Sequence, residues 1–207
     1  MSQKPLFITF EGTDGVGKTT QAKLLKKWLE EKKRRVVLTR EPGGGKISEE
    51  IREILLNPKT KIENLTELFL YQAARIEHVE KIVRPALKTG QTVLCDRFTD
   101  ATIAYQGFAR GLSLKTIDSL NSIATGNLRP DLTIWLDHPP QKALRKARKK
   151  RGDRIENKGF KFQEKVRKGY QFLAKKYQKR FVRIPVRSEV METQNDIRHL
   201  VSKRLFS

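Results

Sequence analysis

Cysteine and histidine are scarce in this sequence. The one cysteine, Cys95, can form no disulfide within the chain, and it lies in an apolar run that favours a buried thiol. The three histidines, His78, His138 and His199, are too scattered to form a metal-binding motif. These shortages exclude a disulfide-stabilised fold and a zinc site built from histidine or cysteine, and they fit the reducing environment of the cytoplasm.

Long hydrophobic runs are also absent. The apolar segment LFITF at residues 6–10 is too short for the core of a signal peptide, and Glu11 ends it. No segment approaches the ~20 apolar residues that a membrane-spanning helix needs. We therefore expect a cytoplasmic protein without a membrane partner.

Acidic residues are few in comparison with basic ones. The chain has 23 Asp and Glu against 44 Lys and Arg, which gives a net charge of +21. The excess is concentrated in residues 141–183, where 18 basic residues accompany 3 acidic ones. Such a segment could bind nucleic acid, form a solvated surface, or close as a basic clamp over a polyanionic small molecule. Composition alone does not separate these alternatives.

Short apolar segments alternate with helical ones along the chain. Strands are predicted at residues 6–11, 35–40, 92–95, 132–137 and 181–186, and helices at 19–33, 48–56, 65–88 and around 114–125. This alternation predicts an α/β fold with a mainly parallel, five-stranded sheet covered by helices on both faces. Because no repeat or linker interrupts the 207 residues, we expect one domain over 1–207, with a mobile, charge-rich loop at 148–160.

The strongest motif is a phosphate-binding loop. Gly12, Gly17, Lys18 and Thr19 complete the pattern G-x-x-x-x-G-K-[ST] between the first predicted strand and the first predicted helix, which is the context that the motif requires. Backbone N–H groups of such a loop attract phosphate oxygens, and we expect Lys18 to reach the β- and γ-phosphates and Thr19 to bind Mg²⁺. The candidate ATP-binding residues are Gly12, Thr13, Asp14, Gly15, Val16, Gly17, Lys18, Thr19 and Thr20.

Asp14 is an unexpected residue in this loop. Two unit charges ~4 Å apart at an effective dielectric constant of ~20 interact by about 4 kcal/mol. A carboxylate turned toward the phosphates would therefore cancel much of what Lys18 contributes. The side chain of Asp14 must therefore point away from the phosphates or bind another ligand.

The phosphate loop alone indicates ATP or GTP. The guanine-reading pattern N-K-x-D of GTPases is missing, since NKGF at 157–160 lacks the aspartate. An ATPase that binds nucleic acid through residues 141–183 stays open as the alternative function.

Further polar residues follow the predicted strands. Asp96 and Arg97 come directly after the third strand, and Arg40 ends the second, at the sheet edge where ligands of α/β proteins bind. Asp96 is a candidate for the magnesium shell, and Arg97 for a second phosphate. Tyr71 and Arg75 share one helix face and could stack on and hydrogen-bond a flat heterocycle, although an interfacial tyrosine beside a solvated arginine fits the spacing equally well.

Together these motifs resemble the thymidylate kinases, over residues 6–177. The resemblance rests on FEGTDGVGKTTQ, TREPGG, LFLYQAARIEHV, CDRFTDATIAYQGFARGL and RPDLTIWLD, in that order. It implies a three-layer phosphate-loop NTPase fold, the reaction ATP + dTMP → ADP + dTDP with Mg²⁺, and a homodimer. It also implies that Asp14 points away from ATP and accepts a hydrogen bond from the 3′-hydroxyl of dTMP.

The resemblance assigns the remaining residues. Tyr71 would stack on thymine, and the polar edge of the base would face Arg75, Thr102 and Gln106. Tyr105 would lie beside the deoxyribose. The acceptor phosphate would be surrounded by Arg40, Arg52 and Arg97, and magnesium would be organised by Glu41 and Asp96. Ala101 replaces a common serine and Tyr71 a common phenylalanine. Residues 184–197 do not match the usual adenine-side segment, so we assign no adenine contacts.

By the same resemblance, residues 148–160 would be a lid that closes over ATP, which gives the basic segment a role without nucleic acid. For stabilising the transferred phosphoryl group we rank Arg151 first, because it precedes Gly152, where the chain can bend inward, and Arg148 second. Arg154 ranks behind them, because it has Asp153 and Glu156 beside it as alternative partners. The candidate catalytic residues are thus Lys18, Asp96, Arg97, Arg151 and Arg148.

Overall fold

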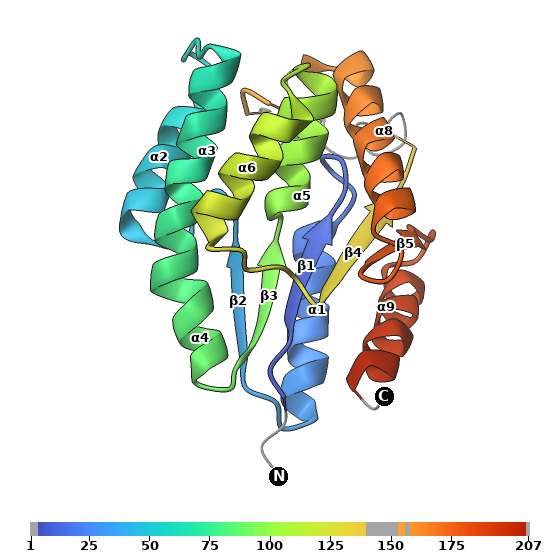
Figure 1. Ribbon diagram of the computed structural model, residues 1–207. Helices are drawn as coiled ribbons and strands as arrows, with labels where there is room; N and C mark the ends of the chain where they lie inside the picture. The colour runs from blue at the N-terminus through green and yellow to red at the C-terminus, as the bar shows by residue number, and fades with distance from the viewer. Residues whose placement is uncertain (1–3, 140–152, 156–157, 206–207) are drawn as a thin grey trace.

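A parallel five-stranded sheet forms the centre of the protein. The computed structural model describes residues 4–139, 153–155 and 158–205. Its strands are ordered β2 (Val36–Arg40), β3 (Thr92–Asp96), β1 (Phe7–Glu11), β4 (Leu132–Asp137) and β5 (Phe181–Pro185). All four neighbouring pairs run parallel (Figure 1). The five predicted strands and the parallel sheet are confirmed.

Helices cover both faces of this sheet. They are α1 (Lys18–Glu31), α2 (Lys46–Leu56), α3 (Asn64–His78), α4 (Arg84–Lys88), α5 (Thr99–Thr102), α6 (Leu114–Thr125), α8 (Phe160–Lys176) and α9 (Val190–Leu205). Two segments are π-helical, η1 (Val79–Val83) and η2 (Ile103–Ala109). The long helix predicted at 65–88 is therefore the succession α3–η1–α4. The π-helical segment η1 ends two residues before Pro85, which can donate no backbone hydrogen bond. The α5–η2 segment was not predicted.

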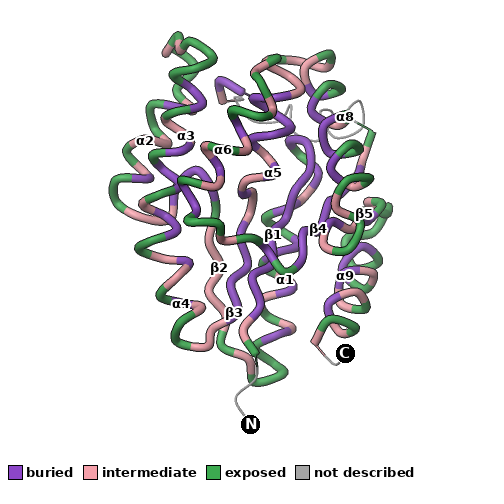
Figure 2. The backbone as a smooth tube through the Cα atoms, in the orientation of Figure 1, coloured by how far each residue is buried: buried purple, intermediate pink, exposed green. Residues whose placement is uncertain are grey.

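The alternation of side chains along β1 divides the core. Ile8 and Phe10 pack with Leu25 of α1 and Ile197 of α9 on one face. On the other face, Phe7 packs with Val83 of η1. Further across the sheet, Trp135 of β4 packs with residues of α6, η2 and α8 on that second face. Figure 2 shows the central strands buried along their length, as β1 is at every residue. The sequence of β1 is apolar at consecutive positions because both its faces are covered.

The parallel register brings three chain turns to one edge of the sheet. The phosphate loop follows β1, Glu41 and Pro42 follow β2, and Arg97 follows β3. Phe10 pairs with Asp96, and Arg40 pairs with Asp96 from the other side. These three turns lie at the carboxyl ends of adjacent strands, where open α/β sheets bind their ligands.

Among the described residues, no helix is both long enough and apolar enough to cross a membrane.

Candidate active site

The phosphate loop folds around the side chain of Lys18. Lys18 Nζ donates hydrogen bonds to the carbonyl oxygens of Gly12, at 3.2 Å, and Thr13, at 2.9 Å. Gly12 has φ +143°, and a Cβ atom there would lie 2.5 Å from the carbonyl oxygen of Leu136, so only glycine fits. The loop backbone thus places the ammonium at the start of α1, beside the N–H groups that attract phosphate.

Burial changes the protonation of this lysine. Burial lowers the pKa of Lys18 to about 8, and the positive charge of Arg97 adds to the shift. Glu11 ends β1 directly before the loop, and burial with the nearby negative charge of Asp100 raises its pKa to about 8. Glu11 accepts hydrogen bonds from the Tyr170 hydroxyl at 2.7 Å and the Phe98 backbone N–H at 2.8 Å. Two groups beside the phosphate loop therefore titrate near neutral pH.

Thr19 and Asp96 meet at the exposed side of the loop. Thr19 Oγ1 donates to the Asp96 carboxylate at 2.6 Å. A hydroxyl and a carboxylate are hard oxygen ligands of the kind that Mg²⁺ prefers. The third predicted metal residue, Glu41, does not join this pair, because its two oxygens bind Arg75 Nε at 2.8 Å and His78 Nδ1 at 3.0 Å. The described residues contain no cluster of three or more His, Cys, Asp or Glu placed to hold a metal.

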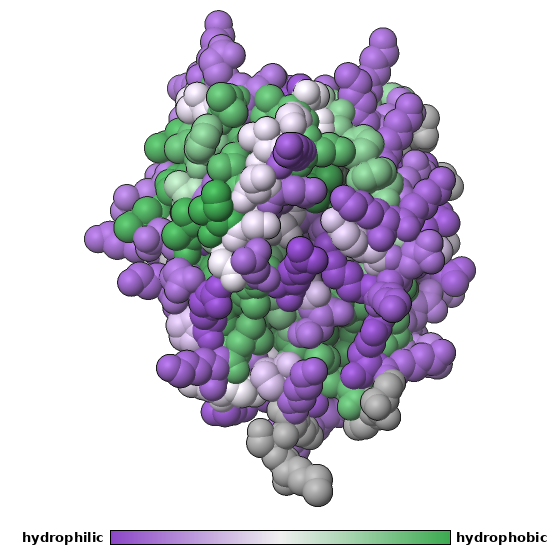
Figure 3. Space-filling model, in the orientation of Figure 1, coloured by the Kyte–Doolittle hydropathy of each residue, from purple (hydrophilic) through white to green (hydrophobic). Residues whose placement is uncertain are grey.

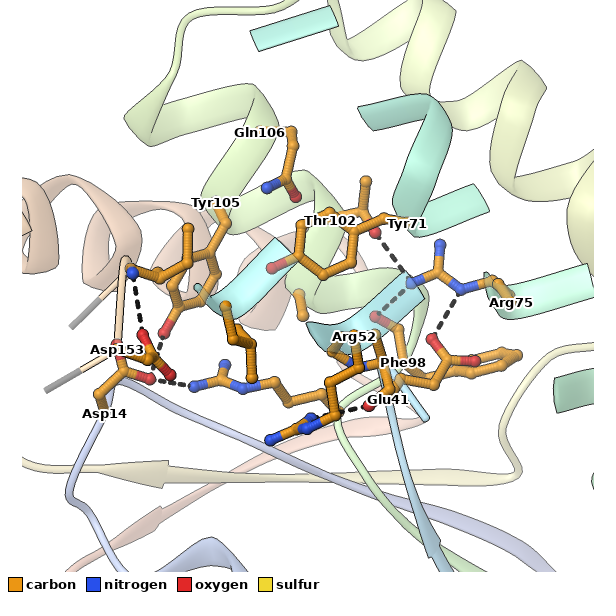
Figure 4. A pocket seen from close by; sticks show the side chains of 15 residues that line it. Asp14, Glu41, Arg52, Tyr71, Arg75, Phe98, Thr102, Tyr105, Gln106 and Asp153 are labelled. Carbon is orange, nitrogen blue, oxygen red and sulfur yellow. Dashed lines mark hydrogen bonds and ion pairs between the residues drawn. The ribbon is translucent and has the colours of Figure 1, made fainter. Parts of the chain in front are cut away.

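One cavity collects the predicted acceptor-site residues. It encloses about 550 Å³ of empty space including its open mouth. Figure 4 shows the side chains that converge on it from the phosphate loop, α2, α3, α5 and η2. Its lining includes Asp14, Arg52, Tyr71, Arg75, Arg97, Thr102, Tyr105 and Gln106. Of the predicted acceptor-site residues, only Arg40 is outside this lining: it is half exposed and binds Glu49 through Nη2 at 3.0 and 2.9 Å.

Asp14 turns its carboxylate into this cavity. The guanidinium of Arg97 binds Asp14 Oδ1, to which the Tyr105 hydroxyl also donates at 3.1 Å. Gln163 Nε2 donates to the other oxygen at 2.6 Å. Arg97 itself has φ +71°, a left-handed conformation that is uncommon for a residue with a side chain, and its guanidinium lies 4.7 Å from the Tyr105 ring centroid. An acidic residue in the phosphate loop is thus held by groups of the neighbouring cavity.

At the far end of the cavity, Arg75 is buried with every N–H donor bound. It donates to Glu41 through Nε, to Gln72 and Asn121 through Nη1, and to the Phe98 carbonyl and the Thr102 hydroxyl through Nη2, at 2.7–3.2 Å. In this arrangement Arg75 positions its neighbours, and a direct bond to a ligand needs one of these donors to be shared. Phe98, Ala101 and Ile155 supply apolar lining, and no short-range pattern in the sequence had marked Ile155.

Several polar residues of the site were not predicted. Gln163 binds Asp14 from 149 residues away, and Tyr170 binds Glu11 from 159 residues away, so no local spacing could reveal them. Glu67 binds Gln106 and two arginines beneath the cavity. Of the predicted lid, Arg148 and Arg151 lie outside the described residues. Arg154 is buried against α2 and α3, where it binds the Leu55 carbonyl at 2.7 Å and Glu67 at 2.6 Å.

Comparison with known proteins agrees with this geometry. The family model for thymidylate kinase matches residues 10–197. A thymidylate kinase of Thermoanaerobacter sp. (strain X514) is 43% identical over 98% of this chain and 100% of its own length. One from Synechococcus sp. (strain JA-3-3Ab) is 46% identical over 98% of both chains. The crystal structure of thymidylate kinase from Ehrlichia chaffeensis superposes with a TM-score of 0.80 at 35% identity, covering 95% of this chain and 98% of that one.

The lowered pKa of Lys18 leads to a pH prediction. Above pH 8 the ammonium loses its proton, whereas the phosphates of ATP gain no further charge there, so the attraction between them weakens. We expect the dissociation constant for ATP to be about tenfold higher at pH 9 than at pH 7, as one ionisation with a pKa of about 8 requires. Calorimetric titration at constant excess Mg²⁺ measures it, and an unchanged constant from pH 7 to pH 9 would contradict the assignment.

Glu11 provides the control for this titration. Its ionisation near the same pH would also weaken phosphate binding, by adding negative charge. The variant Glu11→Gln removes that contribution, and the rise in the dissociation constant should persist in it. Loss of the pH dependence in Glu11→Gln would assign the effect to Glu11 instead.

Proposed function

The chain belongs to the thymidylate kinase family and phosphorylates dTMP to dTDP in the biosynthesis of dTTP, and on this premise we propose that its phosphate loop binds ATP and its cavity binds dTMP. The observation that carries the proposal is Asp14, which belongs to the loop by sequence and to the cavity by its contacts with Arg97 and Tyr105. Donor and acceptor sites therefore adjoin at a single turn of the chain. A phosphate-loop ATPase acting on nucleic acid is not favoured.

The acceptor phosphate would lie between Arg97 and Arg52. Both line the cavity, and Arg97 lies next to the phosphate loop, with one guanidinium N–H on the Gly12 carbonyl at 3.2 Å. A guanidinium binds phosphate oxygens in a bidentate manner. Asp14, facing the same space, would accept the 3′-hydroxyl, and Tyr105 would line the sugar. The base would then extend toward Tyr71, Thr102 and Gln106. Arg40 would approach the phosphate only after leaving Glu49.

Thr19 and Asp96 are the residues that we propose for Mg²⁺, on the strength of their oxygen donors and their 2.6 Å contact beside the loop. Bound there with ATP, the ion would neutralise charge on the phosphate oxygens. Glu41, by contrast, would act by holding Arg75 and His78, because both its oxygens are bound to them.

Phosphoryl transfer in this arrangement needs no protein nucleophile. An oxygen of the dTMP phosphate attacks the γ-phosphorus of ATP, the bond to the bridging oxygen breaks, and ADP leaves. The protein contributes alignment and positive charge, here from Lys18 and Arg97. We also propose that Arg151, or Arg148 in its place, supplies further charge to the transferred group.

A homodimer is the assembly that we propose, through the face of α3 and α6. Large apolar side chains are exposed there: Leu65 (51%), Phe69 (54%), Ile76 (43%) and Ile123 (73%). Figure 3 shows apolar surface over these helices. Exposed apolar side chains gathered on one face can mark an interface. α3 and α6 pack on one another within the chain, which gives this face a firm base. A second copy would bury this surface by presenting the same one.

We place the reaction in the cytoplasm, where Cys95 would stay a thiol. Nucleic acid is no part of the proposed function. Arg167 and Arg183 from the basic segment 141–183 bind Asp137, and Arg180 binds the buried Asp100. Part of the basic charge thus serves the fold itself.

Substrate choice tests the proposed function. We expect the fastest ADP release with dTMP, slower release with dUMP, and negligible release with AMP, GMP or CMP, because the base end of the cavity suits a 4-keto pyrimidine. Steady-state ADP release in a coupled assay measures this. Faster turnover with AMP or CMP than with dTMP would refute the assignment of the cavity, and turnover that needs DNA or RNA but no dTMP would favour the ATPase.

The proposed role of Asp14 has its own test. Asp14→Asn keeps the size of the side chain and removes its charge, so we expect the kcat/KM for dTMP to fall by roughly 10- to 150-fold, as the loss of a charged hydrogen bond of about 1.5–3 kcal/mol implies. Asp14 also orients Arg97, so the decisive readout is the 3′-deoxy analogue of dTMP. Wild type and variant should differ much less with this analogue. An equal loss with both substrates would mean that Asp14 acts only by orienting Arg97.

A charged residue introduced on the apolar face tests the proposed dimer. Phe69→Asp places a carboxylate on the apolar face, and we expect it to halve the molar mass measured by light scattering. Met191→Asp is the matched control, because Met191 is 46% exposed on α9, away from this face. A wild-type protein that is monomeric at micromolar concentration, or a Phe69→Asp variant that stays dimeric, would contradict the proposal.

A further inference from the structure

Glu67 is a buried acid that no part of the proposed mechanism uses. It lies on α3 with no exposed surface, and it is not part of the cavity lining. Its carboxylate accepts a hydrogen bond from Gln106 Nε2 at 2.9 Å. It also binds Arg110, through Nε at 3.1 Å and Nη2 at 2.7 Å, and Arg154, through Nη2 at 2.6 Å. One side chain thus joins α3, η2 and residues 153–155.

These contacts keep Glu67 ionised. Burial alone would raise its pKa, but the hydrogen bonds from Arg110 and Gln106 hold the pKa below its usual value. An ionised carboxylate only accepts hydrogen bonds. Gln106 must therefore direct its amide nitrogen at Glu67, and its amide oxygen is the group left for the cavity. The orientation of this amide, which is ambiguous in isolation, is decided by the charge of its partner.

A similar constraint applies to Thr102, one helical turn before Gln106. Its hydroxyl oxygen accepts a hydrogen bond from Arg75 Nη2 at 2.9 Å, and arginine only donates. The hydroxyl proton of Thr102 is therefore available to another acceptor. Both residues line the cavity, and Figure 4 shows the Gln106 amide and Thr102 beside Tyr71. The cavity thus presents an acceptor from Gln106 and a donor from Thr102, one helical turn apart on the lining.

This pair of groups has the polarity of one kind of pyrimidine. A 4-keto pyrimidine such as thymine offers an N–H donor at position 3 and an oxygen acceptor at position 4, which match the Gln106 oxygen and the Thr102 hydroxyl. Cytosine offers an acceptor at position 3, which would face the acceptor oxygen of Gln106, and an amine at position 4 in place of the oxygen that the Thr102 proton would bind. An unpaired buried acceptor or donor costs about 1–3 kcal/mol. A fixed amide therefore distinguishes the two bases, whereas an amide free to turn over does not.

We propose that Glu67 is a specificity-determining positioning residue, which fixes the Gln106 amide so that the cavity accepts a 4-keto pyrimidine and rejects a 4-amino pyrimidine. The inference rests on the proposed placement of dTMP in the cavity. It adds the residue that sets the polarity of the base-reading group, and Glu67 does so without contact with the substrate.

Glu67 also holds a wall of the same cavity. Arg154 binds Glu67, the Leu55 carbonyl at 2.7 Å and, through its backbone N–H, the Leu56 carbonyl at 3.1 Å. Asp153 and Ile155 on either side of it line the cavity. Loss of Glu67 will therefore weaken binding of every nucleotide to some extent. The ratio between two nucleotides separates base reading from this common effect.

The test is the selectivity of Glu67→Gln, measured as kcat/KM for dTMP, dUMP and dCMP. A glutamine at this position both donates and accepts, so the Gln106 amide can turn over. We expect the dTMP/dCMP ratio to fall at least tenfold from its wild-type value. The dTMP/dUMP ratio should stay within twofold, because uracil and thymine share the same polar edge. Equal losses with all three substrates, leaving both ratios unchanged, would reduce Glu67 to a purely structural role.

Two controls complete the experiment. Glu63→Gln makes the same change at the exposed residue that directly precedes α3, whose side chain makes no capping bond, and it should leave both ratios unchanged. In a Gln106→Leu background, Glu67→Gln should no longer alter the dTMP/dCMP ratio; a persistent change would show that another group carries the effect and would overturn the proposal.

A second variant covers a failure of Glu67→Gln to fold, which thermal unfolding would reveal. Glu67→Asp keeps the negative charge beside Arg110 and Arg154 but withdraws it from Gln106, and it should lower the dTMP/dCMP ratio in the same way. An unchanged ratio in a folded Glu67→Asp protein contradicts the proposal. A wild-type enzyme that prefers dCMP to dTMP would instead refute the proposed function.

Discussion

Compensation of buried charge is the constraint on which the cavity depends. Asp14 is balanced by Arg97, Glu41 by Arg75, and Glu67 by Arg110 and Arg154. A buried charge without a partner costs several kcal/mol of folding free energy. Each of these side chains is therefore held where it contacts the side chain of opposite charge. The same constraint decides which atoms of Thr102 and Gln106 accept and donate in their hydrogen bonds with Arg75 and Glu67. The polarity of the cavity is thus a consequence of ion pairs that lie mostly around and beneath it.

The parallel sheet makes this compensation possible. Because β2, β3 and β1 are neighbours that run in one direction, the turns after them meet at one edge. Glu41, Arg97 and Asp14 each come from a different one of these turns. In the proposed function the phosphate loop would serve both substrates: its backbone and Lys18 would face the phosphates of ATP, while its acidic side chain, bound to Arg97, belongs to the cavity. This division explains how a carboxylate can lie in a loop that attracts phosphate.

Much of the fold and part of the site could be predicted from local sequence patterns. Apolar strands, the glycine-lysine loop and the helix that follows depend on interactions between residues close in the chain. Tyr71 and Arg75 were predicted to share a face, and both line the cavity. The α5–η2 segment was not predicted. Nor was the π-helical middle of the helix at 65–88, because a change of hydrogen-bond pattern within a helix leaves little trace in the spacing of apolar residues.

The sequence by itself determined the order of strands and helices, the phosphate loop and the residues at the strand ends, because these follow from neighbours in the chain. Only the tertiary structure decided which polar groups bind one another. Asp14 meets Gln163, Glu11 meets Tyr170, and Glu67 meets both Gln106 and Arg154 across separations of 39 to 159 residues. A buried donor binds whichever acceptor the packed elements bring within about 3 Å, and that proximity is a property of the packing and of no local pattern.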